Sequence, residues 1–200
     1  METLKVLSRL LDYPTEALYE HGIDVAEIIA NDAALDETNK ASLLAFVDQR
    51  FSDSLLDWQA DYDGLFERGR SLSLLIYEHI HGESRDRGQA MVNLLEQYRA
   101  AGLDIGVREL PDYIPLFLEF VSTQGSENGK GWLQDIAPIL ALLQVRLEKR
   151  DCNYSAVFSA LVALSEAAID VQALREQVKD EKRDYTKKAM DKDWEEEAVT

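Results

Sequence analysis

The most polar passage of the sequence, EHIHGESRDRG at residues 78–88, holds the side chains that could do chemistry. A metal site is disfavoured because His79 and His81 are two positions apart, which points them to different sides of a helix. Metal-binding histidines on helices are spaced by three or four residues, as in HExxH. Glu78, His79 and Glu83 could exchange protons, but no nucleophile elbow or phosphate-binding glycine loop accompanies them. We therefore expect no metal, no cofactor and no catalytic residue.

Two interpretations of the passage stay open. Glu78, Arg85, Asp86 and Arg87 could simply link helix ends through ion pairs, each worth about 0–1 kcal/mol when exposed. Alternatively, two glycines, an abrupt helix end and charges of both signs at one break are typical of a recognition loop on a rigid helical scaffold.

Length and composition limit the class of protein. The chain has 200 residues, is 46% hydrophobic and carries a formal net charge of -17, so we expect one core and one main domain. The acidity disfavours nucleic acid as a partner, because a phosphate backbone needs a positive face. A basic partner would be attracted instead. The lone Cys152 allows no internal disulfide and fits a reducing cytoplasm.

The sequence also predicts a cytoplasmic protein that does not enter a membrane. The start, METLKVLSRLLDYP, lacks the features of a secretory signal. The longest apolar run, at residues 136–143, is far shorter than the roughly 20 residues of a membrane-spanning helix.

Apolar residues recur with helical spacing along most of the chain, which predicts an all-α fold. Leu4, Leu7 and Leu11 form one stripe, and we expect that helix to end at residues 12–14 because a residue before proline is pushed out of the helical region. The next helix should begin at Pro14 or Thr15.

The polar passage lies between predicted helices. One helix contains Trp58 and Tyr62 and ends at residues 66–69, and the next runs through residues 72–76. Residues 82–86 form a second break.

After that break, a helix carrying Met91 should begin with Ser84 or Asp86 as its N-cap and end at Gly102. Residues 124–131, QGSENGKG, have the composition of a flexible loop. The helix of residues 133–147 should have Pro138 near its first turn.

Residues 170–200 are dense in charge, with ten acidic and seven basic side chains, so most of the net negative charge belongs to residues 1–169. We expect a helical domain over 1–169 and a charged tail over 170–200. The tail should form a solvated helix over residues 171–183, aided by a Glu176–Lys179 pair, and be disordered after Tyr185.

Three runs of the sequence resemble nitrate reductase delta subunits, a branch of the TorD-like redox-enzyme maturation chaperones. The likeness extends from LLDYP to about residue 165 and leaves the tail unmatched. At Tyr113 many relatives have histidine instead. The runs are YDGLFERGR at 62–70, SLL at 73–75 with EHIHGESRDRGQAM at 78–91, and ELPDYIP at 109–115 with LEF at 118–120.

The resemblance implies a single-domain TorD-like helical bundle that has no catalytic turnover. Such a protein binds the apo alpha (catalytic) subunit of a molybdenum nitrate reductase, largely through the twin-arginine signal, or a remnant of one, at the N-terminus of that subunit. It holds the subunit until the iron-sulfur and molybdenum cofactors are inserted, then leaves, and would be a monomer or weak homodimer. A chaperone for a related molybdoenzyme and a general acidic helical adaptor stay open as alternatives.

A basic amphipathic segment needs an apolar groove with an acidic rim. By resemblance, Gly82 and residues 111–113 match positions that line the signal-peptide site, and Pro111 should open a helix with Asp112 in its first turn. We expect Glu78, Glu83 and Asp112 to face basic client residues, and aromatic residues to hold apolar ones. The candidate client-binding residues are Tyr62, Phe66, Glu67, Arg70, Glu78, His79, Gly82, Glu83, Arg87, Pro111, Asp112 and Tyr113, and further groove candidates are Tyr77, Phe117 and Glu119.

Overall fold

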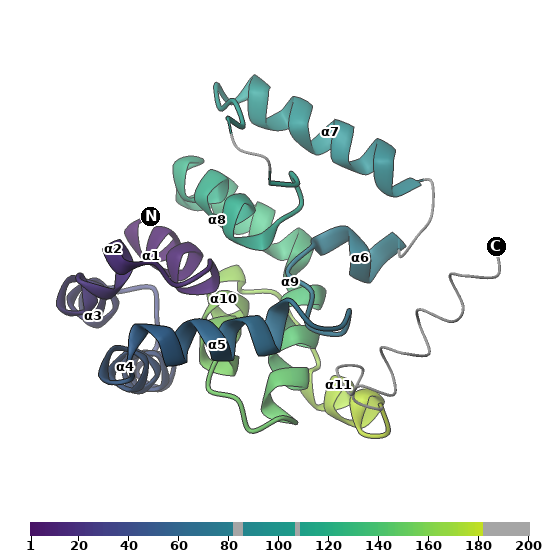
Figure 1. The fold of residues 1–200 in the computed structure, drawn as a ribbon. Coiled ribbons are helices and arrows are strands. Elements are labelled where there is room, and N and C mark those ends of the chain that lie inside the picture. The colour runs from purple at the N-terminus through teal and green to yellow at the C-terminus, as the bar shows by residue number, and fades with distance from the viewer. Residues whose placement is uncertain (82–85, 107–108, 182–200) are drawn as a thin grey trace.

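The computed structural model describes residues 1–81, 86–106 and 109–181, and within these ranges every regular element is a helix (Figure 1). The all-α prediction is therefore confirmed. No helix in the described ranges is both long and apolar enough to cross a membrane. The elements are α1 (Glu2–Leu11), α2 (Glu16–Tyr19), α3 (Gly22–Asn31), α4 (Glu37–Ser52), α5 (Leu55–Phe66), α6 (Ile76–His81), α7 (Asp86–Ala100), α8 (Ile114–Thr123), α9 (Ser126–Glu148), α10 (Ser155–Ser165) and α11 (Val171–Val178).

The core is built around α9 and α10, which pack against each other (Figure 1). Both helices bury apolar side chains at helical spacing, including Leu133, Leu140, Phe158 and Leu161. α4 covers α10, α8 covers α9, and α1 and α3 complete this half by packing on α8 and α4 respectively. These contacts make the rigid scaffold on which α5, α6 and α7 are mounted.

Two specific polar contacts fix α5 to that scaffold. The indole Nε1 of Trp58 donates to the buried hydroxyl of Tyr154, 2.7 Å away. The nearly buried Arg50 of α4 donates to the Asp61 carboxylate at 2.7 Å, and its guanidinium lies over the Tyr154 ring. Because these bonds join α4, α5 and α10, the C-terminal end of α5 has a fixed place beside the core.

Several predicted boundaries are confirmed. α1 ends at Leu11, and Asp12 is extended, as expected two residues before a proline. The next helix, predicted to begin at Pro14 or Thr15, begins one residue later at Glu16, and Thr15 is its N-cap, with its hydroxyl accepting from the Leu18 amide. Gly102, just after α7, has a φ of +79°, the left-handed conformation predicted from its position.

The helix predicted through residues 72–76 is wrong, because α6 begins only at Ile76. The preceding residues instead form an antiparallel bridge in which Leu75 pairs with Tyr113. Their leucine spacing resembles that of a helix, but here the backbone groups bond to a distant part of the chain. A local pattern cannot reveal such a partner.

The flexible loop predicted over residues 124–131 is also wrong. Gly125, with a φ of +79°, is the N-cap, and α9 starts at Ser126. Gly129 is buried within the helix, and a Cβ there would lie 3.2 Å from Met1 Sδ and 3.3 Å from the Val121 carbonyl oxygen. Close packing on the N-terminus and α8 thus overrides the low helical propensity of this stretch.

Pro138 likewise lies in the interior of α9 and not in its first turn. A proline there removes one backbone hydrogen bond. Its exposed position keeps the ring out of the core, while Ala137, Ile139 and Leu140 on either side are buried. The apolar packing of the helix offsets the lost bond.

The start of the predicted tail is helical and docked. The helix is confirmed over Val171–Val178, as is the Glu176–Lys179 pair at 3.6 Å. It is not simply solvated, because Lys149, the residue after α9, donates to the carbonyl oxygens of Val178, Lys179 and Glu181 at 2.7–2.8 Å. The predicted disorder after Tyr185 lies outside the described residues, and the domain boundary at 169/170 stays a prediction.

Candidate functional site

Two segments that the sequence analysis singled out are joined by backbone hydrogen bonds. The Ile76 amide donates to the Asp112 carbonyl at 2.9 Å, and the Ile114 amide donates to the Leu74 carbonyl at 2.8 Å. These bonds clamp the start of α6 to the start of α8. Residues 111–113 therefore lie beside the start of α6, the helix that carries residues 78–81 of the polar passage.

Asp112 is buried and caps the N-terminus of α6. Its Oδ2 accepts from the Tyr77 amide at 3.0 Å, while its Oδ1 has no hydrogen-bond partner. Burial raises the pKa of this carboxyl, and the Tyr77 amide and the charge of Arg87 oppose that rise. Asp112 thus places a hydrogen-bond acceptor at the N-terminal end of the α6 dipole.

The prediction that Pro111 opens a helix with Asp112 in its first turn is wrong. α8 begins at Ile114, with Tyr113 as its N-cap and Pro115 in its first turn, so Pro111 does not open a helix. The Asp112 carboxylate instead caps α6, a helix that precedes it in the chain. With no exposed surface in this structure, Asp112 does not present its charge to solvent.

Glu78, His79 and Arg87 connect α6 to its neighbours. Glu78 pairs with Arg87 of α7 at 3.3 Å, and both side chains are about three-quarters buried, with 25% and 22% exposed. His79 Nε2 lies 2.8 Å from the Ser73 carbonyl oxygen. Burial lowers the pKa of His79, so the neutral ring donates its Nε2 proton to that carbonyl. These contacts fix α6 to α7 and to the segment that precedes α6.

The tyrosines of the region are tied to α1 and α7. Tyr98 of α7 donates its hydroxyl to the Pro111 carbonyl at 2.7 Å. Tyr62 donates to the Leu11 carbonyl at 3.0 Å, and Tyr113 donates to the Asp12 carboxylate at 3.1 Å. Desolvation raises the pKa of Tyr62, Tyr98 and Tyr113, so all three hydroxyls stay neutral near pH 7.

A cavity of about 250 Å³ opens between the end of α5 and the segment before α8, and we call it the α5–α8 cavity. Phe66, Leu74 and the half-buried Tyr113 give it an apolar floor. Glu67 and Glu109 are exposed at its edge. The full lining is Phe66, Glu67, Ser73, Leu74, Leu75, Glu109, Leu110 and Tyr113.

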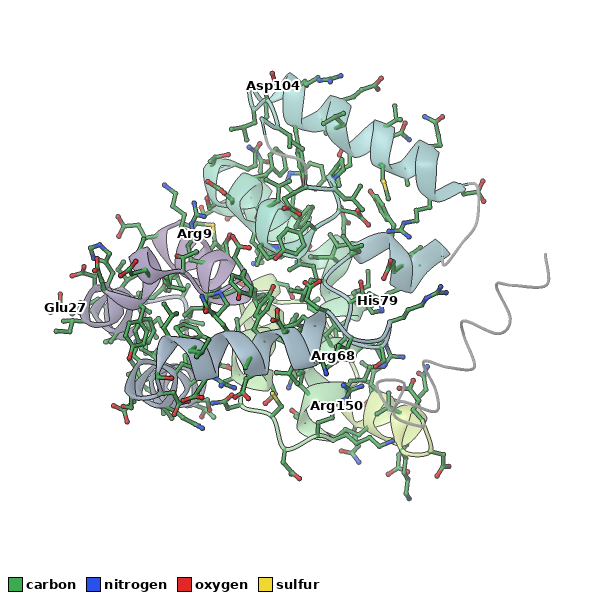
Figure 2. The ribbon with its side chains drawn as sticks, in the orientation of Figure 1. Arg9, Glu27, Arg68, His79, Asp104 and Arg150 are labelled. Atoms are coloured by element: carbon green, nitrogen blue, oxygen red, sulfur yellow. The ribbon has the colours of Figure 1, made fainter. Side chains whose placement is uncertain are left out.

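The structure divides the predicted site residues into two groups. Phe66, Glu67 and Tyr113 line the cavity, whereas Glu78, His79, Arg87, Pro111 and Asp112 form the polar cluster that links α6, α7 and the 111–113 turn. Figure 2 shows His79 on α6 on the same side of the molecule as Arg68, which follows α5.

The remaining candidates fall elsewhere. Tyr62 and Phe117 are core residues with 1% and 2% exposed surface, and Arg70 is exposed in the turn after α5. Tyr77 is half-buried on α6, and Glu119 of α8 is 3.6 Å from Arg9. Gly82 and Glu83 lie outside the described residues.

Leu74, Glu109 and Leu110 line the cavity but were not predicted as site residues. They lie within the SLL and ELPDYIP runs, where no pattern separated them from ordinary surface and core residues. Leu110, 41% exposed beside a carboxylate, is recognisable as part of a lining only once the fold is known.

The described residues contain no group of three or more histidine, cysteine, aspartate or glutamate side chains that could hold a metal ion. Cys152 is partly buried near α10, and burial raises the pKa of its thiol, the opposite of an activated nucleophile. The geometry of the α5–α8 cavity suits binding of an apolar, basic segment.

Comparisons with known proteins show which family the chain belongs to. Residues 30–160 match the nitrate reductase delta subunit family. Over its whole length the chain is 46% identical to the nitrate reductase molybdenum cofactor assembly chaperone NarJ of Escherichia coli K12, covering 84% of that protein. It is 44% identical to NarW of the same strain, again over the whole chain and 83% of the relative.

The fold also matches a crystal structure from Archaeoglobus fulgidus described as that of a redox enzyme maturation protein. The TM-score is 0.52 at 20% identity, over 89% of this chain and 93% of the other, which is a likeness of fold alone. The chain therefore belongs to the nitrate reductase delta subunit family, a family of maturation chaperones and not of enzymes.

Proposed function

We propose that the protein is the assembly chaperone of a molybdenum-containing respiratory nitrate reductase and binds the N-terminal signal-like segment of the apo alpha subunit in the α5–α8 cavity. It holds that subunit until the molybdenum and iron-sulfur cofactors are inserted and is absent from the finished enzyme. It acts in the cytoplasm as a monomer or weak homodimer. The carrying observation is the apolar floor of the cavity with carboxylates at its edge.

The cavity offers both kinds of contact that a basic amphipathic segment requires. An apolar anchor can bury itself against Phe66 and Leu74, while Glu67 and Glu109 can meet arginine or lysine side chains of the segment. Micromolar affinity corresponds to about 8 kcal/mol, which a few buried anchors and partly desolvated ion pairs can supply.

The charge of the whole chain supports the same partner. A net charge of -17 draws a basic segment toward the surface and speeds encounter at low ionic strength. We therefore expect the association rate to fall steeply as salt is added, and the dissociation rate to depend mainly on the apolar floor.

The polar cluster behind the cavity has a positioning role in this proposal. Asp112 and the backbone bonds between residues 74–76 and 112–114 set where Leu74 and Tyr113 lie. The predicted contact of Glu83 with the client also stays a proposal.

A synthetic peptide of the first residues of the alpha subunit, titrated into the protein in a calorimeter, tests the site. The Glu67→Lys and Glu109→Lys double variant should bind at least about tenfold more weakly, since two attractive charges become repulsive. Both residues are exposed, so circular dichroism should show an unchanged fold. Glu83→Lys extends the test to the neighbouring part of the motif.

The matched control is Glu127→Lys with Asp135→Lys, two exposed residues of α9 outside the cavity lining. This variant makes the same change in net charge, so it should alter affinity by less than about threefold. Equal affinity of the cavity variant and the wild type would contradict the proposed site.

Isolation of the protein from nitrate-grown cells separates this role from a general adaptor. A single dominant molybdoenzyme catalytic subunit should co-purify, and its identity distinguishes nitrate reductase from a related client. A mixture of unrelated basic proteins would support the adaptor instead.

A further inference from the structure

We propose that a groove between α3 and α4 is a second docking site, which takes a basic amphipathic helix of a protein partner and is separate from the α5–α8 cavity. Its volume is about 590 Å³, and we call it the α3–α4 groove. This inference does not depend on which segment the α5–α8 cavity binds. The lining is Tyr19, Glu20, Gly22, Ile23, Ala26, Leu44, Val47, Asp48, Phe51 and Ser52.

The groove has an exposed apolar wall. Ile23 is 78% exposed although it is a large aliphatic side chain, and Ala26 and Leu44 are only partly buried beside it. A lone exposed isoleucine would need no explanation, but here it is continuous with a concave apolar lining. Such a lining gains free energy when a partner removes it from water.

The floor of the groove is preformed by aromatic packing. The Phe51 ring stacks on Tyr19 with centroids 6.0 Å apart and meets the buried Trp58 edge-on at 5.2 Å. The Tyr19 hydroxyl donates to the Asp53 carbonyl at 2.7 Å. Because these rings are already held, binding would cost little ordering entropy.

Gly22 is needed for this arrangement. A Cβ at that position would lie 2.5 Å from Cδ1 of the Phe51 ring, which is closer than atoms can pack. The start of α3 can therefore rest directly on the aromatic floor only with glycine there.

The charges around the groove select the occupant. Glu20 and Asp48 line it, and no lysine or arginine does among the residues the structure describes. His21 pairs with Asp24 at 2.7 Å, and Glu27 is exposed further along α3. A second copy of this acidic chain would bring like charges together, whereas a basic helix would complement them.

The shape fits a short helix. The ten residues of α3 span about 15 Å at 1.5 Å per residue, so about three turns of a partner could lie alongside. Its apolar side chains would be spaced at i, i+3 or i+4 and i+7, with basic residues flanking them. The groove and the α5–α8 cavity share no lining residue. Figure 2 shows Glu27, which lies on α3, at the left edge of the molecule, and His79, which lies on α6, to the right of its centre.

The test uses a labelled synthetic helix of about 14 leucine and lysine residues, with leucines on one face, and fluorescence anisotropy. The Glu20→Lys and Asp48→Lys double variant should bind it roughly tenfold more weakly, and so should Ile23→Ser. The Glu127→Lys and Asp135→Lys variant should bind within about twofold of wild type. Replacing the lysines of the probe with glutamates should abolish binding.

Competition decides whether the site is separate. A saturating amount of the alpha-subunit N-terminal peptide fills the α5–α8 cavity, so it should remove only the probe bound there and leave the probe in the α3–α4 groove. Complete displacement of the probe would overturn the inference. So would absence of probe binding, or equal weakening by the groove variant and the Glu127→Lys and Asp135→Lys variant. A dimer in sedimentation that Ile23→Ser converts to monomer would show that a second copy covers the groove, which also overturns it. Weaker binding of the N-terminal peptide by the Glu67→Lys and Glu109→Lys variant tests the α5–α8 cavity alone and does not bear on the α3–α4 groove.

Discussion

The half of the molecule around α9 and α10 is held by apolar packing, whereas the region of α6 and α7 is held largely by polar contacts. Eleven of the 23 residues of α9 are buried, against Leu94 and Tyr98 alone among the 15 of α7. α7 relies instead on the Glu78–Arg87 pair and on the bond from Tyr98 to the Pro111 carbonyl. Regions with little apolar burial open at lower free-energy cost, so α7 should be the more adaptable element.

This difference indicates how a chaperone can combine a stable body with a receptive surface. The α5–α8 cavity lies where the two regions meet, with Phe66 from the packed side and Glu109 from the segment that follows α7. A rigid floor can thus be combined with an edge that adjusts to different side chains of a client.

The largest effect should come from the packed half. Leu140→Ala removes a fully buried side chain of α9 and should lower the free energy of unfolding by about 3–5 kcal/mol. Denaturant melts monitored by circular dichroism would measure it. A loss below about 1 kcal/mol would show that the core around α9 is looser than its burial implies.

A smaller effect is expected at the cap of α6. Asp112→Ala removes the acceptor of the Tyr77 amide and should cost about 1–2 kcal/mol, while Asp112→Asn keeps an acceptor oxygen and should cost less. Hydrogen exchange should show faster opening of α6 in the alanine variant, with α9 unaffected. Equal loss of protection in both helices would contradict the separation into two regions.

The polar link between α6 and α7 should contribute less still. A double-mutant cycle with Glu78→Gln and Arg87→Gln should give a coupling of about 0.5–1 kcal/mol, since the pair is only partly exposed. The exposed Glu176–Lys179 pair is the matched control and should show no measurable coupling. A coupling energy for Glu78 and Arg87 no larger than that of the control pair would show that this ion pair does not hold α6 and α7 together.

The smallest predicted effect is a pH dependence. Burial raises the pKa of Asp112 above its ordinary 3.8, so between that value and its folded pKa the native state binds more protons than the unfolded state. Wild-type stability should therefore fall, relative to Asp112→Asn, as pH rises through this window, and be regained on acidification. Melts of both proteins at several pH values check it, and the opposite slope would mean that the attraction of Arg87 outweighs burial.

Local chemistry allowed part of the fold to be predicted. The end of α1 before Pro14 and the left-handed Gly102 follow from the residues themselves. The start of α9 at Ser126 did not, because the helix there depends on Gly129 packing against Met1 and Val121.

The candidate site was predictable only in outline. Its two motifs are neighbours, yet Asp112 caps α6 and not the helix that follows it, since the cap is formed by a tertiary contact. The α3–α4 groove gave no sequence signal, because Tyr19, Ile23 and Phe51 read as ordinary helix residues until their helices are placed together.

Photo-crosslinking tests the central claim most directly. Leu110→p-benzoylphenylalanine places a photoreactive group at the edge of the α5–α8 cavity, and Ile23→p-benzoylphenylalanine places one at the α3–α4 groove. Illumination with the alpha-subunit N-terminal peptide should crosslink it from position 110 and leave position 23 unmodified. Crosslinking from position 23 alone, or from neither position while the peptide is bound, would contradict the account.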